Sequence, residues 1–215
     1  MKNFLYKEWK LAFHPTVLMF WLLSAMLMIP NYPYFVILFY TMLGIFFINL
    51  NGRENHDIFY SMSLPSKKSD FVKARFAFIV IIEMIQLLAA IPFIALKQGL
   101  HMSGNVVGMD ANISFLAFSL VIYGIVNWVF LKRYFTAPEK VGKTFAIASV
   151  YITVVIAAAE VLVHAVPFVR DRLDTPDPQF LLEKMAALAI GAVIYAALTF
   201  FSMKRSIKVF KTLDI

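Results

Sequence analysis

The 215-residue sequence contains no cysteine. This absence excludes disulfides, thiolate metal sites and a cysteine nucleophile. Charge is also scarce, because only 15% of the residues are charged whereas 61% are hydrophobic. A soluble domain has roughly a quarter of its residues charged and about half apolar. The apolar excess therefore predicts a chain that faces lipid.

Signatures of catalysis are sparse as well. The sequence has no HExxH motif and no pair of aspartates within an apolar segment, which argues against an intramembrane protease. Residues 137–144, APEKVGKT, fit a relaxed phosphate-binding loop. That loop works between a strand and a helix, whereas here it joins two apolar segments, so we interpret the match as coincidence. We expect no ATP hydrolysis by this chain and no metal site or cofactor within it.

Six apolar segments are each long enough to cross a bilayer, which takes about 20 residues. They cover residues 15–30, 33–51, 76–97, 113–131, 144–166 and 182–203. The sequence therefore predicts an all-α membrane protein with six transmembrane helices. No stretch remains for a soluble domain, so residues 1–215 are expected to form a single transmembrane domain.

The basic residues fall mainly on one predicted side. Of the 20 Lys and Arg residues, only four lie on the other side: Lys97, Arg170, Arg172 and Lys184. The rest lie near the two termini and in residues 51–75 and 132–143. Short loops rich in Lys and Arg stay in the cytoplasm, so both termini are expected inside, in a multi-pass plasma-membrane protein. The net charge of +7 then reflects topology and does not indicate nucleic-acid binding.

Residues 1–13 have the pattern of an amphipathic helix. One stripe is polar and the opposite stripe is apolar: Asn3, Lys7 and Lys10 against Leu5, Trp9 and Ala12. This pattern favours a helix that lies in the membrane interface with its lysines pointing outward. The alternative is a charged flank before the first span.

The longest polar interval is residues 51–75, between the second and third spans. It must lie in water or against another protein. Ile58, Phe59 and Met62 share one helical face before the break at Pro65, which suits a short amphipathic helix. We interpret this interval as the place where a partner subunit binds the membrane domain.

Three residues of the second span, Phe39, Phe46 and Asn49, share one helical face. Such a stripe lines a substrate pathway or packs against other helices. In the third span, Glu83 and Gln86 are separated by about one turn. Glu83 is either functional or a structural, protonated glutamate, since charges inside a bilayer are costly.

The fifth span carries a polar stripe that includes Thr153, Glu160 and His164. Glu160 and His164 are one turn apart and could pair. Such a stripe faces a water-filled cavity or forms a polar seam between helices. With Phe39, Phe46 and Asn49, these residues form the predicted substrate pathway.

Three segments carry a resemblance to a known family. They are MKNFLYKEWKLAFHP at residues 1–15, NYPYF at 31–35 and GRENHDIFYSMSLPSKKSDFVKARF at 52–76. The chain resembles permease subunits of bacterial type-2 ABC exporters, especially those similar to the phenol-soluble modulin exporter permease. The resemblance implies a second permease copy, identical or paralogous, and separate ATPase subunits that bind ATP and Mg²⁺. It also implies amphipathic or antimicrobial peptides as cargo, exported from the cell or removed to confer immunity.

In this family the loop between the second and third spans carries a coupling helix, which the resemblance places at residues 54–64, closed by Pro65. The expected coupling residues are Arg53, Glu54, Asn55, Asp57, Ile58, Phe59, Met62, Leu64 and Pro65. Arg53, Glu54 and Asp57 would form polar contacts at the rim. The apolar residues would dock on the ATPase or pack beneath the spans, and residues 132–143 would make a second contact.

Two other functions compete with this interpretation. One is a membrane anchor or substrate-capture subunit that does not transport, and the other is an intramembrane enzyme that uses Glu160 and His164. Co-purification of an ATPase would favour the transporter. Turnover of a lipid or peptide by the purified chain alone would favour the enzyme.

Overall fold

A computed structural model describes residues 2–63, 65 and 67–213, with only the backbone of Lys2. Every regular element in these ranges is a helix. In chain order the elements are α1 (Lys2–Lys7), η1 (Glu8–Ala12), α2 (Thr16–Leu22), η2 (Leu23–Met28), α3 (Val36–Glu54), α4 (Asp57–Ser63), α5 (Lys68–Gly99), α6 (Ile113–Val126), η3 (Asn127–Leu131), α7 (Lys132–Thr136), η4 (Pro138–Lys140), α8 (Val141–Ala165), η5 (Val169–Leu173) and α9 (Leu181–Lys211). The predicted all-α fold is confirmed.

Five helical segments of the described chain are long and apolar enough to cross a membrane: Val36–Glu54, Lys68–Gly99, Ile113–Thr136, Pro138–Ala165 and Leu181–Lys211. A sixth span is added only if the bent pair Asn3–Ala12 and Thr16–Met28 counts as one. The first predicted span therefore differs from the other five. Its helical part, α2 and η2, has seven and six residues and is about 20 Å long.

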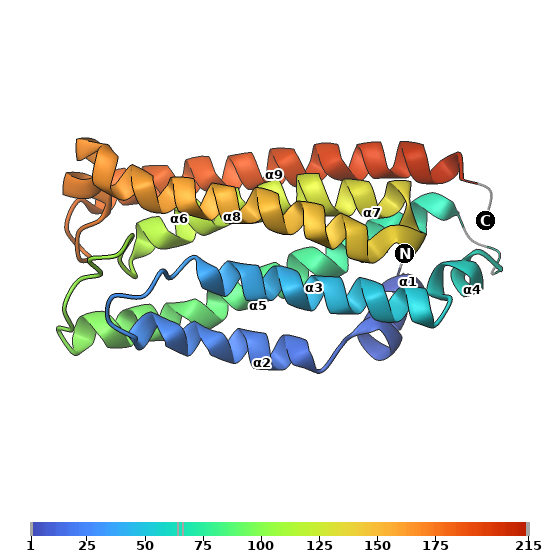
Figure 1. The fold of residues 1–215 in the computed structure, drawn as a ribbon, viewed down its shortest axis with the longest axis horizontal. Coiled ribbons are helices and arrows are strands. Elements are labelled where there is room, and N and C mark those ends of the chain that lie inside the picture. The colour runs from blue at the N-terminus through green and yellow to red at the C-terminus, as the bar shows by residue number, and fades with distance from the viewer. Residues whose placement is uncertain (1, 64, 66, 214–215) are drawn as a thin grey trace.

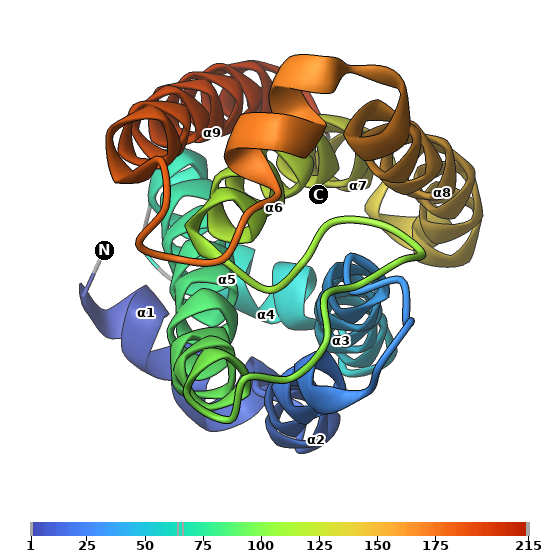
Figure 2. The ribbon, with the colours of Figure 1, turned by 90° about the vertical axis from the view of Figure 1, so that its left-hand side faces the viewer.

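The long helices lie side by side along one axis (Figure 1). Both termini, α1, α4 and α7 lie at the same end of the bundle, and the loops 100–112 and 166–180 lie at the opposite end. The Lys- and Arg-rich segments thus share one end, as the charge distribution predicts. We call it the basic end, and the opposite end the loop end. Figure 2 views the bundle from the loop end and shows α2, α3, α5, α8 and α9 around its circumference, with α6 farther in, beside α5 and α9.

Two of the helix ends differ from the predicted spans. Helix α5 begins at Lys68, inside the interval 51–75, as expected for a helix that enters the bilayer near residue 76, and α9 continues to Lys211, past the predicted end at residue 203. Both extensions project at the basic end (Figure 1). Hydropathy reports where a helix meets lipid, whereas a helix continues into water for as long as its backbone remains hydrogen-bonded.

An aromatic cluster joins three helices at the basic end. Phe71 of α5 stacks on Phe210 of α9, with ring centroids 5.7 Å apart. Phe135 of α7 stacks on Phe76 at 5.8 Å and contacts Phe210 edge-on at 5.6 Å. The four side chains are essentially buried. Aromatic pairs contribute about 1 kcal/mol each beyond their buried area, so this cluster holds the ends of α5, α7 and α9 together.

Further along the bundle, α6 and α9 approach closely because Gly191 has no side chain. A Cβ at this position would lie 2.5 Å from the carbonyl oxygen of Ala117 on α6. Gly124 of α6 similarly faces the backbone of Tyr195 at 3.1 Å. Small residues at such crossings are the usual basis of tight helix packing in membranes.

The N-terminal helix is bent by 85° from α2, an orientation that suits a helix along the membrane surface. The predicted orientation of its lysines is wrong in one respect. Asn3 and Lys10 are exposed, but the Lys7 side chain is 10% exposed and makes ion pairs inside the protein. Lys7 pairs with Glu8, the next residue, and with Asp57 of α4, which draws it inward.

Candidate functional site

Helix α4 lies at the basic end, next to the N-terminal helix (Figure 1). It is separated from α3 by Asn55 and His56, and His56 adopts a left-handed backbone with a φ of 51°. The predicted single helix over residues 54–64 is therefore wrong at its start. Arg53 and Glu54 form the last turn of α3, and α4 begins at Asp57. A left-handed residue ends a helix, because the i to i−4 hydrogen bonds cannot continue through it.

A buried network of four charges holds α4 against the bundle. At its centre is Arg75 of α5, whose side chain is fully buried. Its Nε lies 2.7 Å from the Glu8 Oε2 of η1, and its Nη2 forms an ion pair with Asp57 of α4. Its Nη1 donates to Asn49 Oδ1 of α3 at 2.9 Å. One guanidinium thus connects four separate elements, because it presents several donors in a fixed plane.

Lys7 completes this network. Its Nζ pairs with Asp57, lies 3.5 Å from Glu8 Oε1, and donates to Ser61 Oγ of α4 at 2.8 Å. The two positive charges of Lys7 and Arg75 thereby balance the two negative charges of Glu8 and Asp57. Such balance is what makes a buried ionic cluster tolerable in a low-dielectric interior.

Asp57 is accordingly not the polar rim contact that the sequence predicts. Its side chain is 13% exposed and points into the bundle. Burial alone would raise the pKa of this carboxyl, but the charges of Arg75 and Lys7 outweigh burial and lower its pKa below the ordinary value. Asp57 is therefore an anchor that keeps α4 attached to the bundle.

The opposite side of α4 is free. Phe59 and Tyr60 are 67% and 59% exposed, whereas Ile58 and Met62 are half-buried against the main hydrophobic core. The two alternatives for the apolar residues thus both occur: Ile58 and Met62 pack beneath the spans, and Phe59 is open to a partner. Glu54, Asn55 and Pro65 are also exposed, and Leu64 lies outside the described residues.

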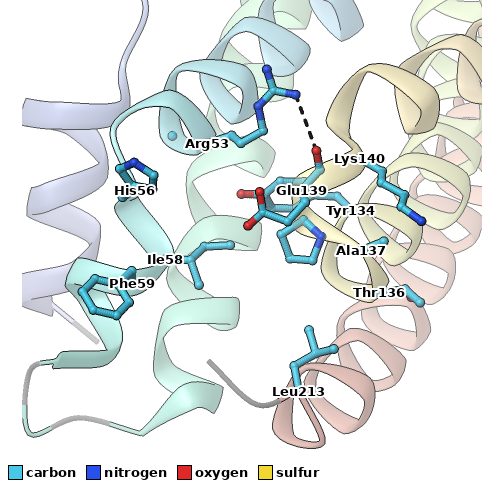
Figure 3. Close-up of a pocket in the computed structure, with 12 residues that line it drawn as sticks. Arg53, His56, Ile58, Phe59, Tyr134, Thr136, Ala137, Glu139, Lys140 and Leu213 are labelled. Atoms are coloured by element: carbon cyan, nitrogen blue, oxygen red, sulfur yellow. Dashed lines mark hydrogen bonds between the residues drawn. The ribbon is translucent and has the colours of Figure 1, made fainter.

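A groove of about 750 Å³ runs between α4 and the segment that joins α7 to α8 (Figure 3). One wall includes Arg53, Ile58 and Phe59, and the other includes Pro138 and Glu139. Arg53 Nη1 donates to the Glu139 carbonyl oxygen at 3.5 Å. The two polar intervals predicted to contact a partner are therefore neighbours in space and form one surface.

Residues 3–211 match the family described as ABC-2 family transporter protein. The chain belongs to the ABC-2 transporter family. It is thus the membrane-spanning permease component of an ABC transporter, a multi-pass protein of the plasma membrane that works with an ABC ATPase. Neither the search of curated proteins nor that of solved structures found a match.

The ABC-2 fold does not bring the six predicted pathway residues together. Phe39 and Phe46 of α3 contact Phe145 of α8, with ring centroids 6.3 and 4.2 Å apart. Asn49 faces the protein interior, where it joins the Arg75 network. Thr153 is exposed on the outer surface of α8. Phe39 and Phe46 therefore share a neighbour, whereas Asn49 and Thr153 lie elsewhere.

Glu160 and His164 lie near the loop end of the permease, where both bind the loop after α5. The Glu160 carboxylate accepts a hydrogen bond from Met109 N at 3.0 Å, and His164 Nε2 lies 3.0 Å from the Val107 carbonyl oxygen. A Cβ on Gly108 would lie 1.6 Å from Glu160 Oε2. No ion pair is found between Glu160 and His164, both described residues; they hold the same loop instead.

The same loop is attached to α5 and to the segment before α9. Lys97, near the end of α5, pairs with Asp110 and donates to Tyr34 Oη at 2.9 Å. Asp174 accepts from Asp110 N at 2.6 Å. Burial raises the pKa of the Asp174 carboxyl to about 6, and the nearby carboxylates of Asp110 and Glu160 add to the increase.

The two predicted polar residues of α5 lie in different environments. Glu83 is fully buried, and its Oε2 accepts from Tyr195 Oη at 2.7 Å and from Asn127 Nδ2 at 3.0 Å. Gln86 donates to Ser24 Oγ of η2 at 2.7 Å. Glu83 therefore has no exposed surface in this chain. Glu83 connects α5 to α9 and to the π-helical turn η3.

Sequence reasoning missed three residues of the buried charge network at the basic end: Lys7, Glu8 and Arg75. Two features of the sequence could have pointed to this network. Glu8 is a carboxylate in an otherwise basic N-terminal helix, and Arg75 is a cation one residue before the predicted third span. Buried opposite charges in a membrane protein usually pair. The sequence offered no means to tell which of the several candidate pairs forms.

Proposed function

We propose that this permease is the membrane half of an ATP-driven exporter in which α4 receives movement from a separate ATPase subunit. The supporting observation is that α4 has two unlike sides. One side is fixed to the bundle by Asp57, and the other presents Phe59 and Tyr60 to solvent. Exposed aromatic residues at the centre of a surface are typical anchors of a protein interface.

The Arg75 network gives this contact a mechanical consequence. A force on α4 acts through Asp57 on Arg75 and Lys7, and so moves α5 and the N-terminal helix together. A flexible loop would absorb such movement, whereas a buried ion pair resists separation. ATP and Mg²⁺ are bound by the ATPase subunit, with no nucleotide site needed in this chain.

The test is Phe59→Ala/Tyr60→Ala in the permease co-expressed with its ATPase. We expect co-purified ATPase to fall by at least about tenfold, because interface anchors contribute roughly 2 kcal/mol or more each. The matched control is Phe200→Ala/Phe201→Ala, an adjacent exposed pair on α9, which should retain full binding. Undiminished ATPase binding by the α4 variant would refute the docking role.

The mechanical role is separated from docking by Asp57→Asn. This variant keeps Phe59 and Tyr60 on the surface but weakens the connection between α4 and α5. We expect the complex to assemble and its cargo-stimulated ATPase activity to be lost. Stimulation equal to that of the unaltered complex would show that movement does not pass through this network.

We propose that the basic end faces the cytoplasm, where the ATPase and its ATP are found. The distribution of Lys and Arg supports this orientation. Because the chain has no cysteine, single cysteines report sidedness without background labelling. A membrane-impermeant maleimide added to intact cells should label Val106→Cys and leave Ser63→Cys unlabelled, and the reverse result would overturn the orientation.

We propose that two permease copies form the transport path between them, with α8 facing the partner copy. Only 28% and 17% of the most apolar windows of α8 and α9 are buried within the chain, so both helices have free faces. Thr153 is a polar residue on the free face of α8, and polar groups are costly against lipid. Thr153→Cys should cross-link two copies, whereas Val193→Cys on α9 should not.

We propose amphipathic peptides, including antimicrobial ones, as the cargo, with export or immunity as the outcome. The resemblance over residues 52–76 supports this class. An amphipathic helical peptide should stimulate the ATPase activity of the complex, and a scrambled peptide of equal composition should not. Equal stimulation by both peptides, or by neither, would exclude amphipathicity as the feature recognised.

A further inference from the structure

A second cavity at the basic end lies beside the groove of Figure 3 but opens between η3, α7 and the start of α8. Its volume is about 570 Å³. Four cations line it: Lys132 and Arg133 of α7, Lys140 of η4 and Lys143 of α8. Glu139, the single carboxylate of residues 132–143, lines the neighbouring groove instead. The wall of this cavity therefore carries positive charge with no acidic residue.

None of these four cations forms an ion pair with any residue in the described part of the chain. At the same end Lys7, Arg53 and Arg75 each have a carboxylate partner, whereas Lys208 and Lys211 of α9 also form no ion pair with a described residue. What distinguishes the four cations is that they line one cavity. Four unpaired like charges around one cavity repel one another, and an anion in the cavity relieves that repulsion. The N-terminus of α8 at Val141 adds a partial positive charge to the same wall.

Apart from Thr136 and Thr144, the remainder of the cavity wall is apolar and aromatic. It includes Trp128 and Val129 of η3 and Ile147 and Tyr151 of α8. The Lys132 ammonium lies 5.3 Å from the Trp128 ring centroid. From Lys140 to Tyr151 the wall follows about 16 Å of helix. Tryptophan and tyrosine lie at the headgroup depth of membranes, so one cavity spans a charged zone and an apolar zone.

We propose that this cavity binds an anionic phospholipid, with its phosphate among the four cations and the upper part of an acyl chain against Trp128 and Tyr151. A soluble anion would use only the charged zone, and an acidic protein surface would not enter the apolar zone. Basic pockets between membrane helices are known to take anionic headgroups. The inference requires neither the cargo nor the ATPase to be identified, although the choice of leaflet rests on the proposed orientation.

The proposal also gives a role to residues 137–144, whose pattern resembled a nucleotide phosphate loop. Lys140, Lys143 and Thr144 of this segment line the cavity. The segment folds as the turn η4 and the first residues of α8 and not as a loop between a strand and a helix. The same residue types that favour phosphate in solution thus meet phosphate at the membrane surface.

Trp128 serves as the reporter of binding. The full chain with Trp9→Phe and Trp21→Phe retains Trp128 as its single tryptophan. It is reconstituted in vesicles that contain phosphatidylglycerol or phosphatidylcholine brominated near the glycerol end. We expect brominated phosphatidylglycerol to quench Trp128 several-fold more strongly at the same mole fraction. Equal quenching by the two lipids would overturn the proposal.

In the same background, Lys140→Gln/Lys143→Gln should reduce this preference by about tenfold or more, since each surface cation gives roughly a fivefold gain in binding to anionic lipid. Lys208→Gln/Lys211→Gln is the matched control, because it removes two exposed cations of α9 at the same end. The control should retain the preference. An equal loss in both variants would show a diffuse surface field and refute a defined site.

Inorganic phosphate added to the vesicles distinguishes a lipid from a free anion. At constant ionic strength, the preference for phosphatidylglycerol should persist, because phosphate has no acyl chain to occupy the apolar zone. Loss of the preference with phosphate, but not with an equal ionic strength of chloride, would assign the cavity to a soluble anion and overturn the lipid assignment.

Discussion

Replacing Arg75 by glutamine tests the network on which the proposed mechanism depends. The change removes one of two positive charges that face the buried carboxylates of Glu8 and Asp57. Lys7 remains, 3.5 Å from Glu8 and paired with Asp57, but one cation cannot neutralise two carboxylates. Removing one partner of a buried pair costs about 3–5 kcal/mol, so Arg75→Gln should lower the free energy of unfolding by about that amount.

The measurement is reversible unfolding of the purified chain in mixed micelles with increasing denaturing detergent. Arg53→Gln is the control, because Arg53 makes a single ion pair with Glu54 at the surface and such pairs contribute at most about 1 kcal/mol. Glu8→Gln/Arg75→Gln leaves the Lys7–Asp57 pair balanced. The double variant should therefore be more stable than the sum of the two single changes predicts, by about 0.5–3 kcal/mol.

Two results would contradict this reasoning. The first is a loss for Arg75→Gln no larger than that for Arg53→Gln, which would mean that the network does not stabilise the fold. The second is strict additivity in the double variant, which would mean that Glu8 and Arg75 do not interact. A loss of stability with positive coupling between Glu8 and Arg75 is the expected outcome.

Three further predictions concern the rest of the bundle. Gly191→Ala should destabilise the α6–α9 contact by about 1–3 kcal/mol, because the new Cβ would lie 2.5 Å from the Ala117 carbonyl oxygen. Unfolding in denaturing detergent measures this loss of stability. Ala192→Val, at the exposed next position, should have little effect. Gly108→Ala should displace Glu160 and increase proteolysis of the loop around it, since the space is already filled; unchanged proteolysis would contradict the contact. The pKa of the Asp174 carboxyl is raised to about 6 in the folded protein. Its contribution to stability is therefore present below the ordinary carboxyl pKa near 4 and is lost as the pH rises through about 6. The melting temperature should fall as the pH rises across this interval, and Asp174→Asn should abolish that pH dependence.

Hydropathy predicted the long helices well, because a bilayer requires about 20 consecutive apolar residues with their backbone hydrogen bonds made internally. It was less successful with the first span, where α2 and η2 together form a short helix. The positions of Lys and Arg predicted that both termini share one end. These properties depend on composition over a window and not on particular contacts.

The orientation of α4 could not be predicted in the same way. Spacing placed Ile58, Phe59 and Met62 on one face, but a seven-residue helix turns according to what it meets. Its partners, Lys7 and Arg75, lie 50 and 18 residues away in the chain. Asp57 therefore looked like a surface carboxylate in the sequence and is an internal anchor in the structure.

The polar stripe of α8 shows the same limit. Its spacing was visible, but Glu160 Oε2 and His164 Nε2 bind backbone groups of the loop after α5, and backbone groups leave no mark in a sequence. Such a contact requires the three-dimensional position of a loop, which helical periodicity does not contain.

The 32-residue helix α5 has a further consequence for how the two sides of the membrane communicate. Arg75 lies near one end and Lys97, attached to Asp110 and Tyr34, lies near the other, about 33 Å apart along a single helix. A displacement of α5 at the basic end would therefore also move Asp110 and Tyr34 at the loop end, to which Lys97 is attached. Pro92, five residues before Lys97, lacks the N–H that would continue the helical hydrogen bonding, so α5 can bend there, close to its attachment at the loop end.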